Sequence, residues 1–328
     1  MKSIASNQTR GFRLVGTYPI TQDNQQLLVD IPRGPHIESC VIRIRGTINV
    51  TTIFTTVRNL SSYLFMRNVQ WVLNSNVTLD SVSGAQLRQL YVTRRQQPVA
   101  TAPSAALGAT TFEASFILDR ALMDMVRPKD SMLKTDVGIS NNQLRIQLGA
   151  LADMYTGAGV ATYTNVSASV YLTDYQEVRT NGQTPAPMFY VKRNGQRQSL
   201  PSAGNGQQVK LNTGNRLRMI SLQQLIAATG EPDLTYTLVN RFRVQRAGDT
   251  RVDMSVLDLL SLNSSTYGIP MAGGQSVIDF ANTGQISGVR YSEFWPIPSS
   301  ADTYLLVDTT AASILDIATI EGVDLAMA

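Results

Sequence analysis

The feature that most constrains the fold is a stretch of sequence that recurs 180 residues later. Residues 29–42 align with residues 209–222, with apolar residues and one glycine at matching positions. Solenoid repeats are at most roughly 50 residues long, so this period indicates two domains of one fold. The 328 residues suffice for two domains that each bury a core. The matched pairs are Val29 and Val209, Ile31 and Leu211, Gly34 and Gly214, Ile37 and Leu217, Cys40 and Ile220, and Ile42 and Leu222.

Charged residues make up 16% of the chain, against about 25% in ordinary soluble proteins. All but five of the 28 basic residues are Arg. Arg is enriched in protein interfaces and Lys is depleted there, so the bias favours contact surfaces, although a lineage bias toward Arg would have the same effect. A net charge of +4 is too mild to indicate sequence-specific nucleic-acid binding. The single cysteine, Cys40, excludes an intrachain disulfide and a Cys-based zinc site.

The sequence contains no targeting or membrane-spanning pattern. Lys2 is not followed by the apolar stretch of a secretory signal, and no run reaches the roughly 18 apolar residues of a membrane helix. We therefore expect a protein that is made in a cytoplasm.

Apolar and polar residues alternate along many short segments, as in a strand with one buried face. Turn signals separate them, among them Asn181-Gly182, Asn194-Gly195 and Gly204-Asn205-Gly206. Many short strands with frequent turns predict antiparallel β-sandwiches. The clearest alternating segments are residues 42–50, 144–148, 166–172 and 241–245.

Two short helices are predicted at comparable places in the two halves. Ser83 and Gln86 form a capping-box pattern before a helix that extends to residue 91. In the second half, Asp249 or Asp253 would cap a helix with an apolar stripe that begins at Val252. The recurrence of strand, turn and helix supports the duplication. A further amphipathic turn is predicted at residues 117–126.

We place the domain boundary at residues 180–187, where one glycine and two prolines interrupt the alternation. The first domain is then residues 14–179 and the second is residues 188–328. Residues 1–13 contain Lys2, Arg10 and Arg13 and no acid, which predicts a basic arm that is disordered or ordered by a partner. Residues 98–111, 156–162 and 267–275 are predicted to be exposed loops.

The sequence offers little for catalysis or for binding a cofactor. His36 has no second His and no cysteine near it to form a metal site, and no Gly-x-Ser-x-Gly motif accompanies it as in a serine hydrolase. The glycine-rich segments lack the Gly-Lys-Ser/Thr ending of a phosphate loop. Asp119 with Asp124, or Asp253 with Asp258, could form an acid/base pair for glycoside chemistry, but helix caps or solvated faces explain them better. We expect no catalytic residue, no metal and no cofactor.

Three segments carry a resemblance to a known family: the entry strand from Ile31-Pro32-Arg33-Gly34 to Ile44, residues 188–195, and residues 209–222. With two consecutive sandwich domains that each hold a short helix, the chain resembles the double jelly-roll major capsid proteins of icosahedral viruses with an internal membrane. It is similar in size and order to those of corticoviruses, tectiviruses and related small bacteriophages. The resemblance implies an all-β fold of two tandem eight-stranded jelly rolls, with short helices in the loops.

The resemblance also implies a function. Each chain would supply two similar domains, so a homotrimer would present six around its axis and could tile an icosahedral shell. Its partners would be further copies of itself in the trimer and in neighbouring capsomers, minor capsid, vertex or membrane proteins, and the lipids of an internal viral membrane. The chain would be made in the host cytoplasm and reside in the virion capsid. Lys2, Arg10 and Arg13 would face anionic headgroups, each charge contributing about 1 kcal/mol, and residues 98–111 and 267–275 would form outward or inter-subunit crowns.

Two other classes of protein remain compatible with the pattern. One is a glycan-binding or glycan-hydrolysing protein built on tandem jelly rolls, although that class is normally secreted. The other is a different virion component, such as a spike or tail protein. Fibres of the latter kind usually have repeats shorter than a domain.

Overall fold

The computed structural model describes residues 8–34, 36–91, 99–121, 131–135, 138–177, 190–212, 214–268, 271, 273–280, 295–296 and 302–323. The chain divides into two compact units. Among the described residues, the first unit comprises residues 8–87 and 99–191, and the second comprises residues 192–323 together with residues 88–91.

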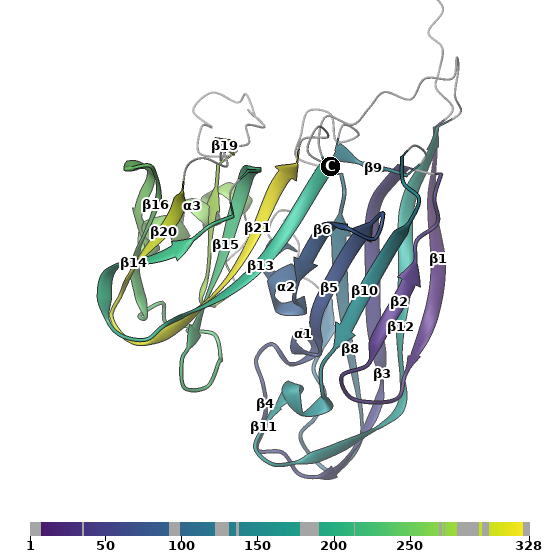
Figure 1. Ribbon diagram of the computed structural model, residues 1–328. Helices are drawn as coiled ribbons and strands as arrows, with labels where there is room; N and C mark the ends of the chain where they lie inside the picture. The colour runs from purple at the N-terminus through teal and green to yellow at the C-terminus, as the bar shows by residue number, and fades with distance from the viewer. Residues whose placement is uncertain are drawn as a thin grey trace, which may run out of the picture. The chain divides into compact units, whose positions relative to one another are not determined.

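Two antiparallel sheets form the first unit, and Figure 1 shows the long strands of one of them, β1, β12, β3 and β8, side by side. We name that sheet the β3 sheet. In order it consists of β1 (Gln8–Ile20), β12 (Val160–Glu177), β3 (His36–Thr52) and β8 (Gly108–Asp119), with β7 (Ala100–Thr101) beside β8 and β9 (Leu133–Lys134) beside β3. The other sheet consists of β6 (Val77–Val82), β5 (Met66–Leu73), β10 (Asn142–Leu148) and β2 (Gln26–Asp30). The connections hold β4 (Thr56–Val57), which pairs with β11 (Tyr155–Thr156), and the short helices α1 (Ser61–Leu64), α2 (Gly84–Leu90) and η3 (Leu151–Met154).

The second unit repeats this arrangement. Its first sheet, which we name the β15 sheet, consists of β18 (Gln275–Asp279), β15 (Arg216–Ile226), β21 (Ser313–Val323) and β13 (Tyr190–Leu200), with β19 (Trp295–Pro296) beside β15. The other consists of β14 (Gly204–Lys210), β20 (Thr303–Thr309), β16 (Val239–Arg246) and β17 (Asp249–Ser255). Helix α3 (Val256–Tyr267) follows β17.

The eight principal strands of each unit have one order. Numbered along the chain within a unit, the first, eighth, third and sixth strands form one sheet, and the second, seventh, fourth and fifth form the other. This is the strand order of an eight-stranded jelly roll. The prediction of an all-β fold with two tandem eight-stranded jelly rolls is therefore confirmed.

The sequence repeat coincides with the second and third strands of each jelly roll. Val29 in β2 and Val209 in β14 are both buried, and so are the matched residues in β3 and β15. Between the strands, Gly34 has φ of 109° and Gly214 has φ of 92°. Only glycine adopts such a conformation without steric cost, which explains the one glycine that the two copies share.

Alternating residues build each core. In β8, every second side chain from Phe112 to Leu118 points inward and is buried. The core of the second unit packs around Phe242 and Val244 of β16 and Leu305 and Val307 of β20. Each fully buried side chain of this size contributes about 1.5–3 kcal/mol relative to an exposed one, so the two faces of each sandwich provide most of the driving force.

The predicted first helix is present, and the second begins later than predicted. In α2, the Ser83 N–H donates to Gln86 Oε1 (2.8 Å) and the Gln86 N–H donates to Ser83 Oγ (3.2 Å), as a capping box requires. Helix α3 is capped by Ser255, whose hydroxyl accepts from the Asp258 N–H (3.1 Å). Asp249 and Asp253 instead lie in β17, because residues 249–255 pair with β16 and this tertiary pairing overrides the helical pattern.

Several expected turns and loops differ from the structure. Asn194-Gly195 lies inside β13, and residues 204–206 begin β14. Residues 117–119 end strand β8 rather than begin a helical turn, because they continue its pairing with β3. Of the predicted loops, residues 98–111 include β7 and the start of β8, and residues 156–162 include parts of β11 and β12. The expected linker, residues 180–187, and residues 122–126 lie outside the described residues.

Candidate functional site

Two of the predicted basic residues, Arg10 and Arg13, lie in β1. The Arg10 guanidinium donates to both carboxylate oxygens of Glu38, at 2.9 and 2.6 Å, and Arg13 pairs with Asp174 at 2.8 Å. Both carboxylates are buried while both arginine side chains stay partly exposed. From residue 8 onward the expected arm is therefore part of the β3 sheet, because buried acids on β3 and β12 neutralise its charges. Lys2 lies outside the described residues.

The outer face of the β3 sheet carries apolar side chains at its β1 edge. Phe12 is 68% exposed and Leu14 is 53% exposed. Phe12 stacks on Tyr171 of the neighbouring strand β12, with ring centroids 5.4 Å apart and planes 5° from parallel. Exposed aromatic and aliphatic residues that cluster on a sheet face typically mark an interaction surface.

The same face carries an ion pair between neighbouring strands. Arg43 Nε donates to Glu113 Oε1 at 2.6 Å, across the β3–β8 pair. The hydrogen bond from Arg43 holds the pKa of Glu113 below its usual value, so this carboxylate stays ionised and hydrogen-bonded at neutral pH. A carboxylate engaged in this way is poorly suited to act as a general acid.

A groove of about 380 Å³ runs over this face, where β12 bulges between Tyr163 and Asn165. A side chain at Gly46 would collide with the backbone carbonyl of Asn165, so glycine permits this close approach of the two strands. Small-molecule pockets are mostly apolar with a few polar groups, whereas this lining is mostly polar and its one ring, Phe112, is buried. The lining residues are Arg45, Gly46, Thr47, Thr101, Thr111, Phe112, Glu113, Asn165 and Ser167.

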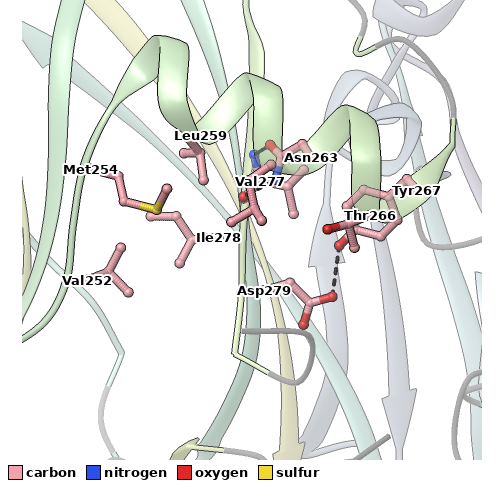
Figure 2. Close-up of a pocket in the computed structure, with 10 residues that line it drawn as sticks. Val252, Met254, Leu259, Asn263, Thr266, Tyr267, Val277, Ile278 and Asp279 are labelled. Carbon is pink, nitrogen blue, oxygen red and sulfur yellow. Dashed lines mark hydrogen bonds between the residues drawn. The ribbon is translucent and has the colours of Figure 1, made fainter. Parts of the chain in front are cut away.

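A smaller cavity lies under α3 in the second unit (Figure 2). Val252, Met254, Leu259 and Ile278 converge on it, and its volume of about 20 Å³ is close to that of one water molecule. At its end, the Tyr267 hydroxyl donates to Asp279 at 2.8 Å. This space is a packing defect beneath the helix rather than a ligand site.

Helix α3 also closes the edge of the β15 sheet. Asn263 Nδ2 donates to the Val277 carbonyl (2.7 Å) and its Oδ1 accepts from the Val277 N–H (2.8 Å). The amide thus occupies backbone groups of β18 that a further strand would otherwise bind.

Of the carboxylates that we weighed for glycoside chemistry, Asp253 and Asp258 are each held by another side chain. Arg241 donates to Asp253 at 2.6 Å and lowers its pKa, and Asp258 accepts from the Ser255 hydroxyl at 2.6 Å. Asp119 ends β8, and Asp124 lies outside the described residues. His36 begins β3 and is buried. Across the described part of the chain, no three His, Cys, Asp or Glu residues gather to hold a metal ion.

A buried cation that we did not predict lies in the first unit. Arg120 is 1% exposed, pairs with the equally buried Asp80, donates to the Val191 carbonyl at 2.6 Å and lies 4.4 Å over the Trp71 ring. The alternation in β8 could have predicted that Arg120 is buried, because the inward series from Phe112 to Leu118 continues to residue 120. A buried arginine is retained only with such partners.

No helix among the described residues is long and apolar enough to cross a membrane. No family model matches the chain, and no curated protein matches its sequence.

Solved structures do match, over almost the whole chain. The STIV major capsid protein, from Sulfolobus turreted icosahedral virus, superposes with a TM-score of 0.77 at 16% identity and covers 97% of each chain. The PM2 bacteriophage major capsid protein gives 0.62 at 14% identity, over 97% of this chain and 99% of the other. The PBCV-1 virus capsid gives 0.65 at 12% identity, over 98% and 95%. The chain has the double jelly-roll fold of viral major capsid proteins.

The likeness spans both jelly rolls in order, so the sequence resemblance to that fold is confirmed. Identities of 12–16% mean that the fold is kept while most residues differ. The surfaces of this chain therefore have to be understood from its own residues.

Proposed function

We propose that the chain is a major capsid protein whose homotrimers form the pseudo-hexameric building blocks of an icosahedral virion shell. The observation that carries this is the match of two consecutive jelly rolls, over 97% of both chains, to a viral major capsid protein. A single-domain match would leave the second jelly roll unexplained.

The duplicated fold has a physical use in such a shell. A trimer of a two-domain chain presents six similar domains, so one gene product can occupy the six-fold positions of a hexagonal lattice. The low charge and the mutually neutralised pairs Arg10–Glu38 and Arg43–Glu113 favour close contact between copies over repulsion. On this proposal the chain is made in a host cytoplasm and resides in the virion, with no enzymatic role and no cofactor.

The proposed contact with an internal viral membrane rests on the N-terminal basic residues, and the proposed minor capsid, vertex or membrane protein partners rest on the likeness to viral capsid proteins. Lys2, Arg10 and Arg13 would face anionic headgroups on the inner side of the shell, and the partly exposed side chains of Arg10 and Arg13 support that role. Their pairing with Glu38 and Asp174 weakens the net attraction, so Lys2 would provide the largest share. Flotation with anionic vesicles would test this, because the triple substitution Lys2→Ala, Arg10→Ala and Arg13→Ala should reduce binding.

Light scattering during size-exclusion chromatography tests the main proposal. The expected mass is three times 35.8 kDa, and electron microscopy of concentrated samples or of purified particles should show hexagonal capsomers. A monomer that binds or cleaves glycans would overturn the proposal in favour of the glycan-active alternative.

A further inference from the structure

The two jelly rolls treat equivalent sheet faces differently. The repeat places Val41 of β3 on Ser221 of β15, and each has an equivalent neighbour on the sixth strand: Val41 pairs with Ile117, and Ser221 with Val277. Two residues further along the third strand, on the same face, Arg43 pairs with Ser115, and Gln223 pairs with Gln275. All four side chains of the β15 sheet are buried, whereas all four of the β3 sheet are partly exposed.

A helical segment covers the β15 sheet at this place. Residues 88–91, the end of α2 and the residue after it, belong to the second unit. Gln275 Nε2 donates to the Gln89 carbonyl at 2.7 Å and to the Ser221 hydroxyl at 3.3 Å. The segment that connects the fifth and sixth strands of the first jelly roll therefore supplies a hydrogen-bond acceptor to the outer face of the β15 sheet.

Helix α3 occupies the same position in the second jelly roll, and its cap gives the alignment. Ser255 and Asp258 form the N-terminal contact of α3 as Ser83 and Gln86 form that of α2. This register places Leu259 on Leu87, and both are buried.

Three other equivalent positions are buried in α2 and exposed in α3. In α2, Ala85, Gln89 and Leu90 are 7%, 1% and 5% exposed. Their counterparts in α3 are Leu257, which is 71% exposed, Ser261, which is exposed, and Leu262, which is 39% exposed. Leu257 thus lies largely in water, and Leu262 is partly exposed, at positions that the other helix buries.

From this pairing of an uncovered helix with an uncovered sheet face, we propose that α3 of one copy packs on the outer face of the β3 sheet of the next copy. The inference rests on the proposed trimer. A contact between two different patches of one chain is heterologous, and three such contacts close a ring. The occupant is a second copy because the chain itself carries both halves of the missing contact. Val256 and Leu259 in its own core, and Asn263 on β18, fix α3 so that its outward leucines cannot also be buried there.

The chemistry of the two surfaces agrees with this contact. Val41 and Ile117 provide partly exposed apolar area at the centre of the face, where the ion pair Arg43–Glu113 is already neutral. Leu257 and Leu262 would remove that area from water. The groove over β3, β8 and β12 gives the helix room on the same face.

Cysteine crosslinking tests the contact directly. Ser261 corresponds to Gln89, and Ser115 corresponds to Gln275, so the double variant Ser115→Cys, Ser261→Cys should be joined by a short bis-maleimide into covalent trimers on a denaturing gel. Neither single variant should form them. The native Cys40 does not interfere, because it is buried.

Disruption of α3 gives a second measurement. Leu257→Asp with Leu262→Asp should raise the concentration at which trimers dissociate by about tenfold or more, measured by light scattering. The matched control is Leu28→Asp on β2, where an apolar side chain is 56% exposed on the other sheet and the trimer should be unchanged. A wild-type trimer that neither crosslinks nor responds to the α3 variant overturns this inference and leaves the proposed function standing. A wild-type monomer overturns both.

Discussion

The β3 sheet and the β15 sheet have the same strand order and apolar inward residues at matching positions, yet their outer faces are opposite in character. From Val41 to Val50 the outward residues of β3 alternate with buried ones and stay partly or fully exposed, whereas β15 is buried at every position from Leu217 to Leu225. The covered face is polar: Ser221, Gln223 and Gln275 lie in it and are held by hydrogen bonds. Duplicated domains can therefore keep one core while their outer faces diverge into a face covered within the chain and a face left for a partner.

The largest expected effect on stability comes from the difference between the cores of the two units. The core around Phe242 is apolar, whereas the first unit buries the pair Arg120–Asp80. Asp80→Ala leaves the Arg120 cation buried without its carboxylate and should lower the free energy of unfolding of the first unit by about 3–5 kcal/mol. Denaturant titration with fluorescence of Trp71, in a Trp295→Phe background, reports on this unit.

The control for that experiment removes both charges. Asp80→Ala combined with Arg120→Met should recover most of the lost stability, because no unpaired charge then remains. Equal stability of the single variant and the wild type would show that the ion pair does not distinguish the cores.

The next effect concerns the connection between the third and fourth strands. In the first unit it contains β4 and α1, and in the second the buried Asp233 organises it by accepting from the N–H groups of Thr235, Thr237 and Leu238. Burial raises the pKa of Asp233, but these bonds and one from the Thr235 hydroxyl lower it overall. Asp233→Ala should cost about 1–3 kcal/mol and speed hydrogen exchange at Thr237 and Leu238. Asp233→Asn keeps one acceptor oxygen, so its stability should lie between those of the wild type and Asp233→Ala. Unchanged hydrogen exchange at Thr237 and Leu238 in both variants would contradict this role of Asp233.

A smaller effect is the cost of replacing a turn glycine, which should be equal in the two jelly rolls. Gly34 and Gly214 both have positive φ and open space where a side chain would be added, so the cost of Gly→Ala is purely a backbone cost. Each substitution should lower the free energy of unfolding by roughly 1–2 kcal/mol, measured by urea titration. Gly204→Ala is the control, since its φ is not positive and the added carbon makes ordinary contacts. Unequal costs at Gly34 and Gly214 would break the equivalence of the two turns.

The smallest effect is the pH dependence of the exposed face. The pKa of Glu113 is lowered in the folded state by the hydrogen bond from Arg43, so its stabilisation is present above the unfolded pKa of about 4.3 and is lost as pH falls through the folded value. Glu113→Gln should cost at most about 1 kcal/mol at pH 7 and should flatten the acid limb of a stability profile. An acid limb identical to that of the wild type would show that the pair contributes nothing.

Local pattern was sufficient for the architecture. The repeat at an offset of 180 located the second and third strands of both jelly rolls, and the Ser83–Gln86 pair located α2. Within each copy of the repeat, as in the Ser83–Gln86 cap, the signal lies between residues close in sequence, which set the inward and outward positions of a strand and the cap of a helix. The same signals failed at Asp249 and Asp253, because β16 competes for that segment through pairing that no local pattern records.

The sequence by itself determined that this chain is two copies of one β-sandwich, since alternation and turn glycines act within a few residues. Only the tertiary structure decided which faces are covered. Leu90 and Leu262 are the same residue type at equivalent helix positions, and one is buried while the other is partly exposed. Whether a side chain is buried depends on which distant segment packs against it, and the residue type alone does not determine that segment.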